Sequence, residues 1–312
     1  MCSLISIIIP CYNCERYFSQ LFNTLTKQTY SHWEAICIDD GSTDNTGKLL
    51  TEFARKDNRI KYFYQTNQGA AKARAYGISK ASGEFITFLD ADDTLPHNAL
   101  EKLLKAFDDA DTDIVVSGFN IIKQSRLVKS KRLSKQKLHS IDYLKKVLCG
   151  KYGWELCAKM YRTKLFDNPI IIPEHIRIGE DASVFIQLVS YAKNIQVMDE
   201  TLYNYIQYES SASHVQSPKY AEETLQAGFF IEDILKQKDF HSEIKNEIDA
   251  MFLLFLSNST RRAFLGKKNK LIKSIYKSHC KLKALCLIPI HKGIYTILYF
   301  FFGKYISKLL FK

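Results

Sequence analysis

Short apolar runs rich in β-branched residues alternate with helical patterns over the first 117 residues of this 312-residue chain. The predicted strands are Leu4–Pro10, Trp33–Asp39, Ile60–Gln65, Glu84–Leu89 and Asp113–Ser117. The predicted helices between them are Glu15–Lys27, Asn45–Lys56, Ala70–Ala81 and His97–Phe107. This alternation is typical of a mostly parallel sheet with helices on both faces. We therefore predict an α/β, Rossmann-like fold, with a pattern that becomes helical with interruptions after Ser140 and almost wholly helical from Lys219 to Lys283.

Polar residues gather where the predicted strands end. The first strand is followed by Tyr12 and Asn13, the second by an aspartate pair, and the fourth by Asp90, Asp92 and Asp93. In a parallel sheet these ends open on one crevice, which is where ligands bind. Asp90 and Asp92 are two residues apart, so in an extended segment they project to the same side and can hold a divalent cation with phosphate oxygens. For Asp93 and Thr94, capping of a helix that begins near Pro96 is the alternative interpretation.

The positive charge is concentrated at one end of the chain. Residues 250–312 contain 13 Lys and Arg and no Asp or Glu, whereas residues 1–249 contain 31 basic and 33 acidic residues. A basic end indicates an anionic partner, either lipid or nucleic acid. The segment Lys123–Lys137 carries seven basic residues and no acidic one, which predicts an exposed hairpin or loop; a solvated face is a more common role for such a run than binding.

The final 29 residues contain two apolar runs, Ala284–Ile290 and Gly293–Gly303, which His291 and Lys292 separate. Neither run reaches the roughly 20 apolar residues of a membrane-spanning helix. A lysine- and aromatic-rich amphipathic segment favours a helix that lies in the membrane interface. Burial of the same segment against the protein's own core is the alternative.

The beginning of the chain does not resemble an export signal, because no basic residue precedes the run Leu4–Ile9 and no small-residue cleavage site follows it. We therefore expect a cytoplasmic protein that associates peripherally with the inner face of the cell membrane. Cys11 and Cys14 form a CxxC pair, but no second pair at metal spacing follows. We interpret them as incidental thiols near a turn.

Five short motifs occur in the sequence in a fixed order and together point to one protein family. They are "IIIPCYN", "IDDGSTDNT", "NQGAAKARAYGI", "GEFITFLDADDTL" and "IGEDASVF", in this order. The chain thereby resembles the family 2 glycosyltransferases, which have the GT-A fold. The first four motifs cover residues 4 to about 95 and the fifth extends the match to about 190. The predicted domains are a catalytic domain over 1–215, with a nucleotide-sugar half up to about 117 and an acceptor half after it, a helical region over 216–283 and an amphipathic membrane-associating segment over 284–312.

The resemblance implies transfer of a sugar from a nucleotide diphosphate to an acceptor hydroxyl, with inversion at the anomeric carbon. The implied donor is a UDP-linked glucose, galactose or N-acetyl derivative, and the implied acceptor is a glycan or lipid-linked saccharide of the cell surface. A divalent cation, Mn²⁺ or Mg²⁺, would stabilise the departing diphosphate.

The resemblance also implies roles for single residues at the strand ends. Pro10, Tyr12, Asn13 and Asp39 would frame the nucleotide, with the Tyr12 ring against the base and Asp39 accepting a hydrogen bond from it. Lys72 and Arg74 would contact the base, ribose or diphosphate. Asp90 would hold the ribose or a metal-bound water, and Asp92 would ligate the metal.

Catalytic residues are implied in the second half of the matched region. Direct displacement needs a general base for the acceptor hydroxyl, and the resemblance assigns this role to Asp181, with Glu180 positioning the donor or acceptor. Acidic residues also favour the first turn of a helix for structural reasons. Trp154 matches an aromatic residue that lines the sugar or acceptor pocket, and packing in the core is an equal alternative.

One stretch departs from the family pattern. Many relatives have a basic residue soon after the tyrosines of "LYNYIQYESSASH", where this chain has Ile206 and Gln207. His214 is our candidate for the missing contact or for a further metal ligand, and a surface role is the ordinary alternative for a single histidine.

Three other classes of protein fit this pattern less well. A dinucleotide-dependent oxidoreductase would carry GxGxxG at its first turn, which is absent here. A nucleotidyltransferase, the strongest enzymatic rival, would more often have a glycine-rich basic loop near its first strand. A nucleic-acid-binding protein would suit the basic end, but its aromatic residues lie within apolar runs rather than among the charges.

Overall fold

The computed structural model describes residues 3–107, 109–208, 217–262 and 269–302. The chain divides into two compact units, and each unit is assembled from three separate stretches of sequence. Unit 1 consists of residues 1–140, 155–170 and 191–209, and unit 2 of residues 141–154, 171–190 and 210–312. The domain boundaries expected at 215 and 283 stay predictions.

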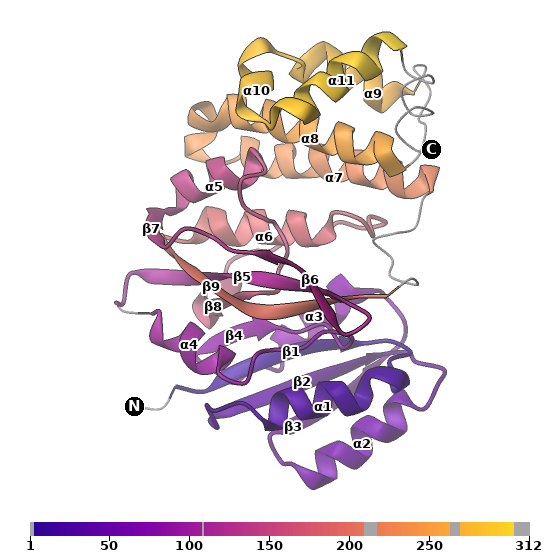
Figure 1. Cartoon of the computed structure of the whole chain (residues 1–312), viewed down its shortest axis with the longest axis vertical. Helices are drawn as coiled ribbons and strands as arrows, with labels where there is room; N and C mark the ends of the chain where they lie inside the picture. The colour runs from indigo at the N-terminus through magenta and orange to yellow at the C-terminus, as the bar shows by residue number, and fades with distance from the viewer. Residues whose placement is uncertain (1–2, 108, 209–216, 263–268, 303–312) are drawn as a thin grey trace. The chain divides into compact units, whose positions relative to one another are not determined.

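Unit 1 is built on one sheet, whose described strands follow the order β3-β2-β1-β4-β8-β5-β9-β7, with β6 paired to β5 (Figure 1). The strands β1 to β5 and β9 run in one direction, because the parallel pairs join β1 to β4 and β5 to β9, and β8 is antiparallel to both β4 and β5. This confirms the predicted mostly parallel sheet. The strands are β1 Ile5–Cys11, β2 Trp33–Asp40, β3 Ile60–Gln65, β4 Phe85–Phe88, β5 Thr112–Lys123, β6 Arg126–Lys131, β7 Gln136–His139, β8 Lys159–Arg162 and β9 Asn194–Gln207.

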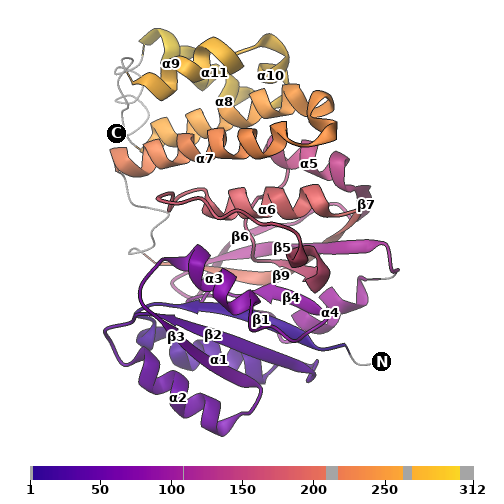
Figure 2. The same cartoon turned by 180° about the vertical axis from the view of Figure 1, so that it is seen from behind.

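Helices cover both faces of this sheet because neighbouring residues of the central strands are buried, and their side chains point to opposite faces (Figure 2). On β1, the residues Ile5, Ile7 and Ile9 join a buried cluster with α1 (Phe18–Thr26), α2 (Thr46–Lys56) and α4 (Ala99–Lys105). The residue between two of them, Ile8, contacts α3 (Ala70–Ile78) instead. The approach of α3 is close enough that a Cβ atom on Gly77 would lie 2.6 Å from Ile8 Cγ2.

The predicted strands and helices up to residue 117 are present, although β5 extends six residues beyond the predicted end at Ser117. The basic segment forms the predicted exposed hairpin, since β6 pairs with the end of β5 and all its residues are exposed. The pattern predicted after Ser140, helical with interruptions, contains two strands that the sequence analysis did not identify: β8 and the 14-residue β9, which complete the sheet. The register of β9 against β5 shifts at several places, which breaks the two-residue period that reveals a strand in sequence.

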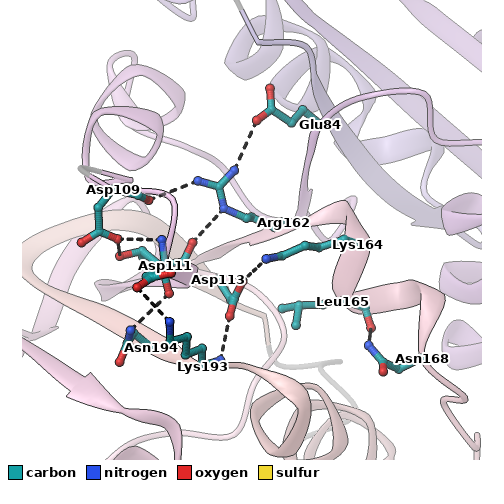
Figure 3. Close-up of polar contacts among 11 residues, drawn as sticks. Glu84, Asp109, Asp111, Asp113, Arg162, Lys164, Leu165, Asn168, Lys193 and Asn194 are labelled. Carbon is teal, nitrogen blue, oxygen red and sulfur yellow. Dashed lines mark hydrogen bonds and ion pairs between the residues drawn. The ribbon is translucent and has the colours of Figure 1, made fainter.

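A network of charged residues lies at the end of the sheet where β5 and β9 begin (Figure 3). Asp113 is buried; its carboxylate accepts a hydrogen bond of 2.7 Å from the Lys193 backbone N–H and lies 2.8 Å from Lys164 Nζ. Arg162, at the end of β8, donates to the Thr112 carbonyl at 2.9 Å and to Glu84 at 3.2 Å. These contacts connect β4, β5, β8 and β9 at the end of the sheet opposite to the polar strand ends.

Unit 2 is helical, as predicted for the region after Lys219, and also includes two helices from earlier in the chain. The central helix α8 packs against α7, α9, α10 and α11 (Figure 1). The described helices are α5 Ser140–Leu148, α6 Glu180–Tyr191, α7 Pro218–Lys236, α8 Lys245–Arg262, α9 Lys270–His279, α10 Leu282–Leu287 and α11 Ile290–Phe302. Within these ranges, we find no helix whose length and apolar character would let it cross a membrane.

Candidate functional site

Hydrogen bonds join the loop that follows β1 to the loop that follows β2. The Asn13 backbone N–H donates to Ser42 Oγ at 3.0 Å, and the Thr43 N–H donates to Asn13 Oδ1 at 2.8 Å. Asn13 itself has a left-handed backbone with φ 48°, which asparagine tolerates better than most residues. The loops are therefore held in one arrangement before any ligand arrives.

An exposed aromatic ring and a buried carboxylate lie at the ends of the adjacent strands β1 and β2. Tyr12 is 53% exposed. Asp39 is buried, and its carboxylate accepts a 2.9 Å hydrogen bond from the Ser42 N–H and a 3.5 Å bond from the Tyr62 hydroxyl. In the register of the sheet, Cys11 is opposite Asp39. A planar base could stack on the Tyr12 ring and reach Asp39 with an N–H group.

The helix α3 brings a cation to the acidic strand end. The Asp40 carboxylate orders the turn before this helix, because it accepts hydrogen bonds of 2.8 Å from both the Gln68 and Gly69 N–H groups. Arg74, on α3, is buried, and its Nη2 donates to Asp90 Oδ1 at 2.8 Å. Lys72 is exposed on the same helix. Arg74 and Asp90, both predicted to contact the nucleotide, therefore contact each other, and their nucleotide-binding roles stay predictions.

Asp92 has the electrostatic character of a cation ligand. It is partly buried, and burial together with the nearby charge of Asp90 raises its pKa to about 6. Carboxylates that repel one another release that repulsion when a divalent cation binds. Arg74 engages one oxygen of Asp90, and the metal-binding role of Asp92 stays a prediction. No group of three or more His, Cys, Asp and Glu side chains within the described part of the chain is arranged to hold a metal. The residues present thus fit a Mg²⁺ or Mn²⁺ ion that takes most of its ligands from a diphosphate and water.

Asp93 has a different role from the capping that the sequence suggested. The helix α4 begins at Ala99, after Asn98, and Asp93 makes its contacts elsewhere. Asp93 is 1% exposed; Oδ2 accepts a 2.6 Å bond from the Tyr203 hydroxyl and Oδ1 accepts a 2.7 Å bond from the Ile206 N–H. Thr94 likewise forms a bridge with Asn204. The capping interpretation is therefore wrong: these residues fasten the acidic turn to the end of β9, more than 100 residues away in sequence.

Burial, and then the charges of Asp90 and Asp92, raise the pKa of Asp93 to about 8. The unfolded chain releases this proton near pH 4. Between these two values the folded state alone holds the proton, so wild-type stability falls as pH rises through the window, at most about 1.4 kcal/mol per unit. Asp93→Asn keeps the shape and does not titrate. In metal-free buffer we expect its melting temperature to exceed that of wild type by a margin that grows from pH 5 to pH 8. A margin that stays constant over this range would show that Asp93 is already charged in the fold.

A groove beside Asp92 was not suggested by the sequence. It has a volume of about 580 Å³ and lies between α1 and the Thr94–His97 segment. Its described lining includes Arg16, Lys27 and His97 and no acidic side chain. At one end the Arg16 guanidinium lies over the rings of Tyr17, at 4.5 Å, and Tyr208, at 5.7 Å. The groove can therefore accept an anionic group, and it is recognisable only once α1 and the residues after Asp93 are brought together.

The two carboxylates predicted for catalysis form the first turn of α6 in unit 2. Gly179, before them, has φ 99°, and a Cβ atom there would lie 2.7 Å from Ala227 Cβ, so this position needs glycine. The Ser183 N–H and hydroxyl both donate to the Gly179 carbonyl, at 3.0 and 2.8 Å. These contacts fix where α6 begins and leave Glu180 and Asp181 partly exposed. Their catalytic roles stay predictions.

Two further predicted residues have separate outcomes. Trp154, also in unit 2, is partly buried and packs edge-to-face on Phe255 with ring centroids 4.9 Å apart. This contact agrees with the core alternative, and the sugar-pocket role stays a prediction. His214 lies outside the described residues. Ile206, where relatives often have a basic residue nearby, contributes its backbone N–H to Asp93.

The sequence is similar to those of known proteins. Residues 6–168 match the family described as Glycosyl transferase family 2. The uncharacterized glycosyltransferase EpsJ of Bacillus subtilis is 30% identical over 236 residues, which are 72% of this chain and 67% of EpsJ. The putative teichuronic acid biosynthesis glycosyltransferase TuaG of the same organism is 29% identical, over 67% of this chain and 81% of TuaG. Some relatives match over less of their length, such as 40% of GlyG from Streptococcus pneumoniae.

Solved structures share the fold. The S. aureus TarS fragment 1–349 in complex with UDP-GlcNAc has a TM-score of 0.70 and 21% identity, covering 94% of this chain and 87% of that one. The mannosyltransferase PcManGT of Pyrobaculum calidifontis in complex with GDP-Man and Mn²⁺ has a TM-score of 0.58 and 14% identity, covering 98% of this chain and 86% of that one. At these identities the likeness establishes the architecture, which is that of GT-A proteins.

Proposed function

The chain belongs to glycosyl transferase family 2, and from this premise we propose that it transfers a sugar from a UDP-linked donor to a hydroxyl of a glycan or lipid-linked acceptor. The transfer would invert the anomeric carbon and would serve cell-surface polysaccharide synthesis. The observation that carries the proposal is the strand-end site of unit 1, where an exposed Tyr12, a buried Asp39, the Arg74–Asp90 pair and Asp92 lie on adjoining loops.

The site suits a nucleoside diphosphate at both of its ends. Tyr12 offers a ring face, and each Asp39 oxygen that already accepts one hydrogen bond has a second lone pair for a base N–H. Arg74 holds the Asp90 carboxylate in place through a charge-assisted hydrogen bond. Asp92 is the proposed metal ligand, and a bound Mg²⁺ or Mn²⁺ would supply Lewis-acid stabilisation of the departing diphosphate.

The complexes solved for structural neighbours support the choice of donor and metal. TarS has been solved with UDP and with UDP-GlcNAc, which supports a uridine donor here. PcManGT has been solved with Mn²⁺, which supports a divalent cation. UDP-linked glucose, galactose, N-acetylglucosamine and N-acetylgalactosamine all fit the proposal, because the strand-end residues contact the nucleotide rather than the sugar.

Donor and metal can be tested together with the purified chain and a panel of nucleotide sugars. We expect slow release of UDP from at least one UDP-sugar in Mn²⁺ or Mg²⁺, and a fall of at least about 100-fold in excess EDTA, because the charge on the diphosphate is then uncompensated. GDP-mannose is the matched donor control. Full turnover in EDTA would contradict the requirement for a metal. Release of GDP from GDP-mannose, with no release of UDP from any UDP-sugar, would contradict the uridine donor.

We propose Asp181 as the general base and Glu180 as the residue that positions the substrates. A carboxylate at the start of a helix stays ionised at neutral pH more readily than one in the middle, because the N–H groups of the first turn stabilise its charge. An ionised carboxylate is what a base needs. Trp154 is proposed to line the sugar or acceptor pocket with the face that does not contact Phe255.

The acceptor and the location belong to the same proposal. TuaG is named for teichuronic acid biosynthesis, a cell-surface polymer pathway, which supports a glycan or lipid-linked acceptor here. A lipid-linked acceptor is held in a membrane, so we propose that the protein works as a peripheral enzyme at the inner face of the cell membrane.

A further inference from the structure

The helix α11 has two apolar faces, of which one is buried and the other is exposed. Tyr295, Thr296 and Tyr299 are buried, and the Tyr276 hydroxyl of α9 donates to the Thr296 carbonyl at 2.9 Å. The other face is exposed: Ile290 is 80% exposed, Ile294 53% and Phe301 61%. Ile297 and Leu298 are 40% and 39% exposed.

These exposed residues follow a helical spacing. Ile290, Ile294, Ile297 and Phe301 are four, three and four residues apart, so they form one stripe along the helix. Five large apolar side chains gathered on one exposed face are unusual for a surface with no partner, since monomeric proteins rarely expose contiguous apolar patches. We call Ile290, Ile294, Ile297, Leu298 and Phe301 the α11 outer face.

The α11 outer face sits on folded protein rather than on a loose tail. Just before it, Ala284 and Ile288 are buried in a core cluster with Leu253 and Leu254 of α8 and with Cys149. Within the described residues 284–302, one side of the segment therefore agrees with the core-packing alternative and the other side is exposed, while interface binding stays a prediction. Deleting the segment would damage the core, so single exposed residues are the right probes.

The segment that carries the α11 outer face is basic. Between residues 250 and 312 the chain has no acidic residue. Lys273 and Lys277 of α9 and Lys283 of α10 are exposed, and Leu282, beside Lys283, is 78% exposed. Two copies of this surface facing each other would bring like charges together, which opposes self-association. A negatively charged bilayer complements both the apolar stripe and the lysines.

We propose that the α11 outer face is a docking surface for anionic lipid bilayers, with α11 lying parallel to the membrane. A helix of 13 residues is about 20 Å long, and side chains on one face of such a helix enter the headgroup boundary to a depth of about 5 to 10 Å. The helix docks as part of folded unit 2. The proposal does not depend on the proposed sugar transfer.

The test uses the full chain and sedimentation with vesicles. One set contains phosphatidylglycerol and phosphatidylcholine, and the other phosphatidylcholine alone. We expect wild type to sediment with the anionic vesicles and to be released by high salt. Ile294→Glu combined with Ile297→Glu should raise the lipid concentration for half-maximal binding at least tenfold, because it puts two carboxylates on the docking face. Ile290→Glu alone should act in the same direction and guards against misfolding of the double variant.

Ile171→Glu is the matched control, because Ile171 is a 50% exposed isoleucine of unit 2 outside this face. It should bind as wild type does. Equal binding of all variants, equal binding to neutral vesicles, or equal loss in Ile171→Glu would overturn the proposal. A concentration-dependent dimer that the Ile294→Glu and Ile297→Glu changes abolish would replace the bilayer with a second copy. Release of UDP in the absence of vesicles should be unchanged in every variant, which separates this result from the proposed function.

Discussion

Asp92→Ala is expected to abolish sugar transfer and leave the fold intact. The change removes the carboxylate that we propose as metal ligand, so the diphosphate would leave with its charge uncompensated. Loss of a single transition-state donor costs about 10² to 10³ in rate, and loss of a metal site should cost at least that. Burial and Asp90 already raise the pKa of Asp92, so its removal relieves repulsion in the metal-free fold. UDP release and the melting temperature measure the two effects.

Asp199→Ala provides the control for Asp92→Ala. Asp199 is an exposed carboxylate of unit 1 on β9, away from the strand-end loops. Its replacement should change neither UDP release nor stability by more than a factor of two or about 0.5 kcal/mol. Activity of Asp92→Ala within tenfold of wild type at saturating Mn²⁺ would move the metal to other ligands.

Asp181→Asn is expected to reduce transfer by about 10² to 10⁴-fold, the usual contribution of a general base. Asparagine keeps the size of the side chain but lacks the basic oxygen, so the acceptor hydroxyl would attack without losing its proton in time. Donor and metal affinity should stay near wild type, which calorimetric titration with UDP and Mn²⁺ can check. Near-normal transfer by this variant would keep the reaction class and assign the base elsewhere.

Two further measurements distinguish the roles at the start of α6. Glu180→Gln should lower the rate less than Asp181→Asn does, or should act mainly on the Michaelis constant, since Glu180 is proposed only to position substrates. The product should have the anomeric configuration opposite to that of the donor, because a single displacement inverts the carbon. Proton NMR coupling at the anomeric position reads this directly, and retention would exclude the mechanism whatever the variants do.

The first 107 residues could be predicted well because their signals are local. Apolar runs of strand length, helical periods and polar residues at strand ends each occupy a few neighbouring residues, and the sheet then brings the ends together. For this reason the sequence alone identifies Tyr12, Asp39, Asp90 and Asp92 as candidate site residues. Arg74 was predicted from a motif, and its buried contact with Asp90 gives that prediction a physical basis.

Contacts between distant residues could not be predicted in the same way. Asp93 looked like a helix cap because capping is the local role of aspartate at such a place, while its partners Tyr203 and Ile206 are more than 100 residues away. The bulges of β9 hide its period. The side of α11 that is buried was equally hidden, since a run such as "IYTILYFFF" has apolar residues on every side, and only packing decides which ones are covered.

The division of each unit among three stretches of chain has a consequence for the order of synthesis. The end of α5, with Cys149 and Gly150, packs against Leu254 of α8, so this part of the nascent chain waits for about 100 further residues to leave the ribosome. At 5 to 20 residues per second the wait is roughly 5 to 20 s. The start of α6 waits as well, since Gly179 contacts Ala227. A shortened protein that ended at residue 215 would leave these apolar surfaces bare, so expression of the catalytic part should retain the helices up to α11.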